Sequence, residues 1–298
     1  MPNSRAWTAL GVPIDSAGAT AGDPAFGSEL SPAVLRDLGL VRRLAALDAG
    51  DLDVRITGSG RDEKSGMVGW PSLGPAVTSI RTAVTGLLVD GRRPLILGGC
   101  CTLLMGAAPA ARDVLGRIGL AYVDGHVDVY DNHTSPTGEA ADMPVAALLG
   151  RGWPDLLAAM GAMPVVGSSD IVVIGARDQA EAADIGDLPD RLGLTVYGPD
   201  AIKAGAATLG SAVRDMFASA AVPYWLHLDV DVLDEHAFPA TDYLMPGGID
   251  VGQLTELLQP HGQDRHLIGA SVACYNPEKD PDRRCGAALT DALAVALG

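Results

Sequence analysis

Acidic and imidazole side chains gather at two places in the sequence, each directly after an apolar run. The first is Asp124-Gly-His126-Val-Asp128, and the second is Asp229-Val-Asp231. In an extended chain, residues two and four positions apart point to the same side, so each group can converge on one point. Carboxylates held that close repel one another unless cations lie among them. Carboxylates together with an imidazole suit Mn²⁺, Mg²⁺ or Zn²⁺.

Five such ligands are too many for one small site and match two metal ions that share bridging carboxylates. Two metal ions roughly 3.5–4 Å apart hold and deprotonate a bridging water, which gives a hydrolytic nucleophile. The competing interpretation is that the acids cap loops and solvated strand ends. That interpretation is favoured for a lone Asp-x-Asp pair, and the two patterns together, each after an apolar strand, favour a dinuclear metal centre.

A third apolar run ends in LGGCCTL, which contains Cys100 and Cys101; Cys274 and Cys285 complete the cysteines of the chain. Four cysteines in 298 residues do not make a disulfide scaffold. Adjacent cysteines are also poorly placed to bridge each other, because their side chains diverge in an extended backbone. Cys274 as a nucleophile lacks a histidine partner nearby in the sequence. The residues alone leave metal ligation, nucleophilic chemistry and packing open.

Strand-like and helix-like segments alternate along the whole chain, and several strand-like runs are continuously apolar, as in strands buried on both faces. The expected strands are Trp7–Ile14, Leu52–Thr57, Pro94–Leu97, Gly119–Val123, Ile171–Ile174, Leu194–Tyr197, Tyr224–Val230 and Leu267–Cys274. The expected helices are Ser31–Asp48, Gly74–Asp90, Thr102–Leu115, Glu139–Leu149, Ala206–Ala220, Val251–Leu258 and Gly286–Leu297. Surface loops are expected at Gly60–Gly69 and Asp178–Leu188.

This alternation predicts an α/β fold with an eight-stranded, mostly parallel sheet and helices on both faces, in a single three-layer α/β/α domain over residues 1–298. Eight strands could also close into a barrel. In open sheets of this kind, sites form at the carboxyl ends of the strands, where both acidic patterns lie. The elements therefore place the chemistry at one edge of the sheet.

The chain carries a formal net charge of −16, with 48% hydrophobic and 19% charged residues. That balance argues against nucleic acid or an anionic membrane as partner. No apolar run reaches the roughly 18 residues of a transmembrane helix, and the first residues lack the pattern of a signal peptide. The expected location is therefore the cytoplasm, and the expected partner is a small molecule.

The motifs resemble those of the ureohydrolase family, which includes arginase and agmatinase. Where that family carries GGDH[S], DAHxD and [SF]DxDxxDP, this chain has GGCCT at 98–102, DGHVD at 124–128 and LDVDVLD at 228–234. SPAVLRDLGL, TGEAADMPVAALLG, MPGGID and CYNPEKD are similar to further blocks of the family, so the resemblance covers nearly the whole chain. It implies an arginase-like fold, a homo-oligomer (trimer or hexamer), and a dinuclear manganese centre that hydrolyses a guanidine or amidine C–N bond.

The resemblance implies six metal ligands: Cys101, Asp124, His126, Asp128, Asp229 and Asp231. Asp124 and Asp229 would bridge two ions, Asp128 would complete one site, and His126 with Asp231 would complete the other. Cys101 stands where the family has a histidine. As a thiolate it would move the preference from Mn²⁺, the expected ion, toward Zn²⁺, Fe²⁺ or Co²⁺; the alternative is a buried cysteine beside a weak or lost metal. Cys100, which replaces the family's aspartate, is expected to pack.

Two further positions depart from the family pattern. Ala141 stands where the family has a proton-shuttling histidine. Glu139, expected to be catalytic together with Asp128, could replace it as a general acid if its pKa is raised, or could simply favour the dipole of a helix start. The helix-start interpretation is preferred for Asp142. His133 is another candidate in the same loop for the substrate site, although a solvated loop histidine is more common.

Cys274 stands where the family has the glutamate that binds the guanidinium group. A neutral thiol cannot form a bidentate carboxylate–guanidinium pair. Either Glu139 supplies that contact, or the substrate is a modified guanidine such as a hydroxyguanidine. Two alternatives to an active hydrolase remain at this point: a catalytically inactive binding or scaffold protein on the same fold, and a redox or metal sensor built on Cys100, Cys101 and Cys274.

Overall fold

The computed structural model describes residues 6–16, 27–58, 60–178 and 188–298. Eight strands form one sheet in the order β2-β1-β3-β8-β7-β4-β5-β6, and every neighbouring pair is parallel. The strands are β1 (Trp7–Val12), β2 (Leu47–Asp51), β3 (Arg93–Gly98), β4 (Gly119–Val123), β5 (Ile171–Ile174), β6 (Thr195–Tyr197), β7 (Tyr224–Asp229) and β8 (Leu267–Ala273). Within the described residues β2 and β6 are the two edges and do not pair with each other, so the parallel sheet is open and the barrel alternative is wrong.

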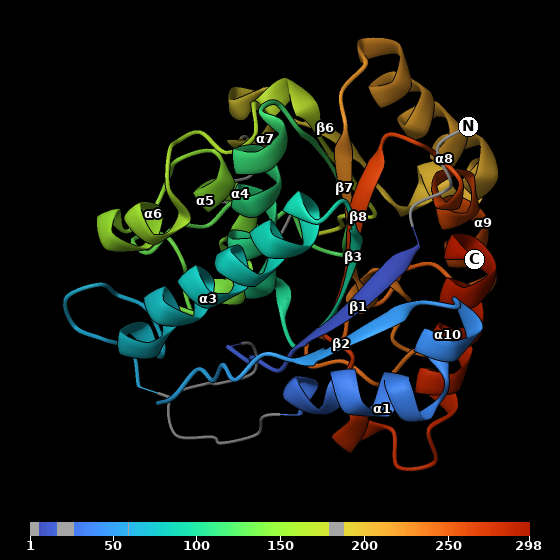
Figure 1. Cartoon of the computed structure of the whole chain (residues 1–298), viewed down its shortest axis with the longest axis horizontal. Helices are drawn as coiled ribbons and strands as arrows, with labels where there is room; N and C mark the ends of the chain where they lie inside the picture. The colour runs from blue at the N-terminus through green and yellow to red at the C-terminus, as the bar shows by residue number, and fades with distance from the viewer. Residues whose placement is uncertain (1–5, 17–26, 59, 179–187) are drawn as a thin grey trace.

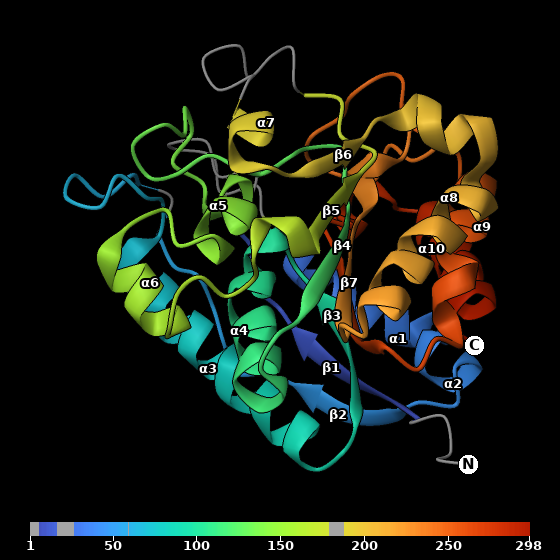
Figure 2. The same ribbon diagram turned by 90° about the horizontal axis from the view of Figure 1, so that it is seen from above.

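Helices cover both faces of the sheet, which confirms the three-layer α/β arrangement (Figures 1 and 2). One face carries α3 (Trp70–Val89), α4 (Leu104–Leu115), α5 (Pro144–Leu148) and α6 (Pro154–Met160). The other face carries α1 (Ser31–Asp37), α2 (Leu40–Arg43), α8 (Pro199–Ala220), α9 (Val251–Gly262) and α10 (Arg284–Leu297). A short α7 (Leu188–Leu192) precedes β6. Across the described ranges, none of the helices is both long and apolar enough to cross a membrane.

The centre of the sheet is fully buried and its edges are not. Every residue of β3, β4, β7 and β8 is buried, as their largely apolar sequences predict for strands covered on both faces. All five residues of β2 are exposed, and β6 alternates between exposed and half-buried. The four central strands are neighbours in the order β3-β8-β7-β4, so their carboxyl ends form one continuous floor.

The first crossover differs from its prediction. The expected strand Leu52–Thr57 is wrong: the strand is Leu47–Asp51, and the expected helix Ser31–Asp48 ends at Asp37 and resumes only over Leu40–Arg43. Gly39, in the left-handed region with φ 89°, separates the two short helices. The sequence LDAGD of the edge strand is polar and exposed, so it lacks the apolar pattern that predicts a buried strand.

Other elements differ by smaller amounts. The expected helix Glu139–Leu149 is a 3-10 turn over Ala140–Asp142 followed by α5, because Pro144 fits the first position of a new helix. The helix expected from Ala206 already begins at Pro199, and α6 and α7 were not predicted. The expected loop Gly60–Gly69 lies between β2 and α3, as predicted. Most of the expected loop Asp178–Leu188 falls outside the described residues.

Candidate metal centre

Four neighbouring strands deliver chemically active side chains to one place. Cys101 follows β3, Asp124 follows β4, Asp229 ends β7 and Cys274 follows β8. Because the strands are parallel, these four positions lie at the same edge of the sheet. The ends of β3 and β8 are also tied together, since the Cys274 backbone N–H donates to the Gly99 carbonyl over 2.7 Å.

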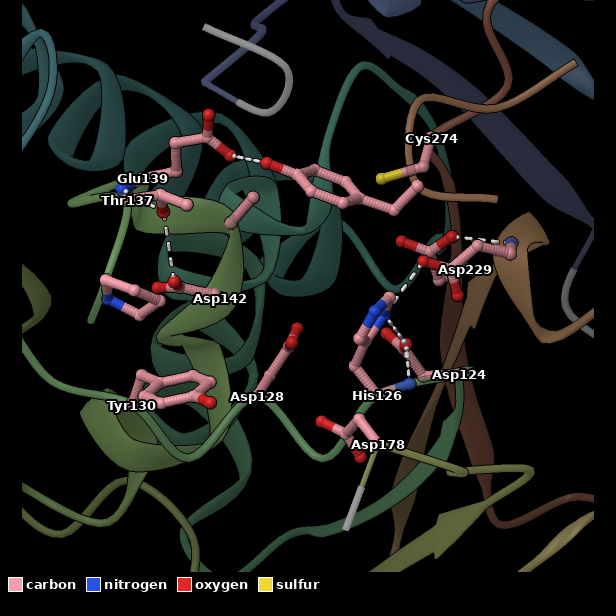
Figure 3. Close-up of a pocket in the computed structure, with 14 residues that line it drawn as sticks. Asp124, His126, Asp128, Tyr130, Thr137, Glu139, Asp142, Asp178, Asp229 and Cys274 are labelled. Carbon is pink, nitrogen blue, oxygen red and sulfur yellow. Dashed lines mark hydrogen bonds and ion pairs between the residues drawn. The ribbon is translucent and has the colours of Figure 1, made fainter. Parts of the chain in front are cut away.

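One cluster forms around the imidazole of His126 (Figure 3). Its Nδ1 atom lies 2.9 Å from Asp231 Oδ2 and 3.5 Å from Asp124 Oδ1. The turn after β4 holds the two carboxylates: the His126 N–H donates to Asp124 Oδ1 over 2.7 Å, and the Gly125 N–H donates to Asp231 Oδ1 over 3.0 Å. One ligand atom from each of the three residues lies within 4.8 Å of the others, which is close enough to share one metal ion.

A second cluster forms around the sulfur of Cys101. This atom lies 2.7 Å from Asp229 Oδ2, 3.7 Å from Asp124 Oδ2 and 3.8 Å from the sulfur of Cys274. His227 Nε2 lies 3.2 Å away from it. Among the described residues, Cys101, Asp124 and His227 form one set of ligand atoms within 4.8 Å of each other, and Cys101, Asp229 and Cys274 form another.

Asp128 is placed differently from the prediction by spacing. The residues after Val123 leave the extended conformation, and Asp128 itself has a left-handed φ of 52°. Its carboxylate accepts a hydrogen bond from the hydroxyl of Tyr122 and does not belong to any of the three ligand sets of the described chain. The turn, and not the alternation of a strand, therefore brings Asp124 and His126 together while it aims Asp128 at another part of the pocket wall.

Burial and mutual repulsion make the carboxylates of the cluster costly to ionise in the absence of a cation. Burial and the charge of Asp231 raise the pKa of Asp124 to about 7, and burial with the charges of Asp231 and Asp124 raises the pKa of Asp229 well above its usual range. Burial opposes the charge on His126, but Asp231 and Asp124 raise the pKa of the imidazole well above its ordinary value. In the described residues, no lysine or arginine forms an ion pair with these carboxylates. Among the described residues, His126 is the ion-pair partner of Asp124 and Asp231. Carboxylates, imidazole and thiol together make a donor set that fits divalent metal ions.

A pocket opens above the cluster. It is lined by Asp124, His126, Asp128, Tyr130, Pro136, Thr137, Glu139, Ala141, Asp142, Asp178, Asp229, Asp231, Tyr243 and Cys274. Figure 3 shows Glu139 and Asp142 on the wall that faces Asp124 and Asp229. Glu139 is 2% exposed and accepts a hydrogen bond from the Tyr243 hydroxyl. Asp142 accepts from Ser135 Oγ over 2.7 Å, and burial raises its pKa to about 7.

Most of the predicted site residues line this pocket; Cys101 belongs to the second cluster without lining the pocket, His133 lies outside it, and Cys100 packs as expected. His133 is exposed, is not among the lining residues, and has its imidazole next to the side chain of Asn132 at 3.5 Å. Cys100 is buried, and its sulfur accepts the Ser16 N–H over 3.2 Å. Neither side chain belongs to the acidic cluster.

Some residues of the site were not predicted. His227 lies two positions before Asp229 on β7, so the same period-two rule could have pointed its side chain toward the cluster. It is completely buried, and burial lowers its pKa to about 3, so the imidazole is neutral. Tyr243 comes from an irregular segment that carries no periodic signal.

Comparison with known proteins identifies the relatives of this chain. Residues 6–297 match the family model described as Arginase family. The arginase of Brevibacillus brevis is 28% identical over 294 residues, covering 97% of this chain and 94% of that protein. Two solved structures share the fold. Arginase from Bacillus caldovelox gives a TM-score of 0.86 at 23% identity, over 99% of this chain and 98% of that one. Formimidoylglutamase from Bacillus subtilis gives 0.77 at 19% identity, over 98% and 86%. The chain therefore belongs to the arginase family.

Proposed function

We propose that this protein is a metal-dependent hydrolase that cleaves the C–N bond of a guanidino or amidino group in a small molecule. The observation that carries the proposal is that the two carboxylate oxygens of Asp124 lie in different clusters. Its Oδ1 atom belongs to the cluster of His126 and Asp231, and its Oδ2 atom faces the Cys101 sulfur at 3.7 Å. A carboxylate with one oxygen in each cluster is placed to bridge two metal ions.

The second candidate bridge is Asp229. Its Oδ1 atom accepts the Asp231 N–H over 2.8 Å, and its Oδ2 atom lies 2.7 Å from the Cys101 sulfur. One ion would be held by the cluster of His126 and Asp231 and the other on the side of Cys101, whereas Asp128 lines the pocket outside both clusters. Bound divalent ions supply a metal-activated water and Lewis acidity. Mn²⁺ is the ion implied by the family, and the thiol of Cys101 favours Zn²⁺, Fe²⁺ or Co²⁺.

The facing wall of the pocket is suited to a cationic substrate. None of the 14 lining residues is a lysine or arginine, whereas Glu139, Asp142 and Asp178 add carboxyl groups beyond the ligand clusters. Glu139 is buried and Tyr243 donates to its Oε2 atom, so its carboxylate is held at the pocket wall as a negative charge that can pair with an amidinium or guanidinium. This residue can take over the contact for which the family uses a glutamate at the position of Cys274.

Asp142 is the better candidate for the proton donor. A general acid works best when its pKa lies near the working pH, and burial places the pKa of Asp142 at about 7. Its hydrogen bonds from Ser135 and Thr137 fix the carboxyl at the pocket wall beside Ala141, where the family has its histidine. We therefore assign substrate binding to Glu139 and proton donation to the leaving amine to Asp142.

The test is turnover of a panel of guanidines, hydroxyguanidines and amidines by protein loaded with Mn²⁺, Zn²⁺, Fe²⁺ or Co²⁺. The variants Asp124→Asn and Asp229→Asn should lose bound metal and about 10³-fold or more in activity, the loss expected when several kcal/mol of stabilisation by metal disappear. Asp215→Asn, an exposed carboxylate paired with Arg214, is the matched control. Saturable binding of the panel without release of product from metal-loaded protein would contradict the hydrolase and favour the inactive binding protein.

The family resemblance also predicts a homo-oligomer, a trimer or hexamer, and the sequence pattern predicts a location in the cytoplasm. Both stay predictions. Light scattering on the purified chain measures the number of subunits, and fractionation of the producing cells measures the location.

A further inference from the structure

Two thiols that are far apart in the sequence face each other at the metal centre. The sulfur atoms of Cys101 and Cys274 lie 3.8 Å apart although 173 positions separate the residues. Both side chains are buried, with 2% and 8% exposure. These are also two of the positions where the chain departs from the family motifs, which have a histidine and a glutamate there. The structure therefore joins two departures that the sequence presents as separate.

The spacing of the two sulfurs fits a shared metal ion. Two thiolates at about 2.3 Å from a tetrahedral ion lie ~3.8 Å from each other. A disulfide would need about 2.05 Å between the sulfurs, and plain packing would leave them without a common polar partner. Here Asp229 supplies that partner: its Oδ2 atom lies 2.7 Å from the Cys101 sulfur, and one of its carboxylate oxygens lies within 4.8 Å of both sulfurs.

A hydrogen-bond chain behind Cys101 supports a thiolate at that position. The Trp225 indole N–H can only donate, so it donates to Ser271 Oγ over 3.0 Å. In the described contacts the Ser271 hydroxyl has one other partner, His227 Nδ1 at 2.7 Å, so its proton points there. His227 Nε2 then carries the ring proton and donates it to the Cys101 sulfur over 3.2 Å. A donor aimed at a ligating sulfur stabilises the negative charge of the thiolate and fixes its direction.

We propose that Cys101 and Cys274 bind one ion of the centre together as a pair of thiolates, with Asp229, and that this position selects a thiophilic ion of the Zn²⁺ type over Mn²⁺. The inference rests on the proposed function, because it assigns ligands within the same metal centre. The oxygen and imidazole cluster of Asp124, His126 and Asp231 forms the other position. Cys274 then belongs to the metal and not to the substrate, although the resemblance aligns it with the family's substrate-binding glutamate and so implies a place in the substrate site.

The experiment uses metal-free protein in a thiol-free phosphine reductant, titrated with Co²⁺ and, in competition with a chelator, with Zn²⁺ and Mn²⁺. The variants are Cys101→Ser and Cys274→Ser, and Cys100→Ser is the matched control because its sulfur contacts Ser16 instead of the cluster. We expect thiolate-to-cobalt charge-transfer absorption at full strength in the wild type and in Cys100→Ser, and at about half strength in each of the other two. Zn²⁺ affinity should fall at least about 10–100-fold in Cys274→Ser, since that range holds for groups that only support a ligand, and Mn²⁺ affinity should fall less.

Unchanged charge-transfer absorption in Cys274→Ser would overturn the proposal. If that variant does not fold, X-ray absorption on wild-type protein loaded with one equivalent of Zn²⁺ decides instead: two sulfur scatterers per zinc at about 2.3 Å support the pair, and one or none overturns it. Wild-type protein that binds Co²⁺ without any sulfur charge transfer overturns the thiolate pair and leaves the proposed hydrolase standing. Wild-type protein that binds no divalent metal overturns both.

Discussion

The sulfur of Cys101 lies 2.7 Å from Oδ2 of Asp229, with both atoms buried at the carboxyl end of the central strands. Burial raises the pKa of the Cys101 thiol, and burial with neighbouring carboxylates raises the pKa of Asp229. In the metal-free protein a proton therefore lies between sulfur and oxygen. A divalent ion at this position replaces that proton, so metal binding and proton release are coupled.

This coupling predicts a pH dependence with a definite sign. The pKa of Asp124 is about 7 in the folded chain and 3.8 as an ordinary carboxyl, so the metal-free fold loses stability as the pH rises from about 4 through 7. A bound divalent cation offsets this shift of the Asp124 pKa, because its positive charge favours the ionised carboxylate. The gain in melting temperature on adding metal should therefore grow between pH 5 and pH 8, measured by calorimetry on metal-free and metal-loaded protein. A gain that shrinks with rising pH would show that the carboxyls are not the ligands.

The variant Glu139→Gln should weaken substrate binding without changing the amount of bound metal. The change removes one carboxylate from the pocket wall but none of the clustered ligand atoms, so metal content should stay that of the wild type. We expect kcat/KM to fall about 10–100-fold, the loss for a hydrogen bond to a charged group. Tyr243→Phe, which removes only the hydroxyl that donates to Glu139, should give a smaller loss. Metal lost together with activity in Glu139→Gln would assign this carboxylate to the metal centre instead.

Asp142→Asn should remove one limb of the pH–rate profile. A carboxyl that must be protonated to donate, with a pKa of about 7, makes activity fall as the pH rises through 7. The variant should be about 10²–10⁴-fold slower below pH 7 and should no longer show that limb. The measurement is kcat against pH for both proteins on one substrate of the panel. An identical limb in the variant would assign the proton to another group.

Gly99→Ala tests how the end of β3 is positioned. A Cβ atom there would lie 1.5 Å from the Ile14 carbonyl oxygen, and the Gly99 carbonyl accepts from Cys274, so the backbone beneath Cys101 must shift. We expect a loss of about 2–4 kcal/mol in the free energy of unfolding, measured in urea, and weaker binding of metal. Gly86→Ala in α3 is the control: a Cβ there meets no neighbour within 4 Å, so stability should rise by about 0.5–1 kcal/mol. Equal stability of the two variants would contradict this account.

The sequence predicted the parts of the fold where burial is uniform. Strands such as Gly119–Val123 and Ile171–Ile174 are apolar at every position because both faces are covered, and their predicted bounds agree with β4 and β5. The edge strand β2 was displaced in the prediction because backbone pairing with β1, and not side-chain burial, makes LDAGD a strand. Pairing between distant segments leaves little trace in local composition.

The sequence by itself determined which residue types could do chemistry here and that each of the two acidic patterns follows an apolar strand. It could do so because strand periodicity and ligand chemistry are local properties. Only the tertiary structure decided which of these side chains meet. It turned Asp128 aside through a left-handed backbone, left His133 exposed away from the pocket, and brought Asp142 into it. It also set Cys101 against Cys274, since the order β3-β8-β7 makes neighbours of residues that no local pattern connects.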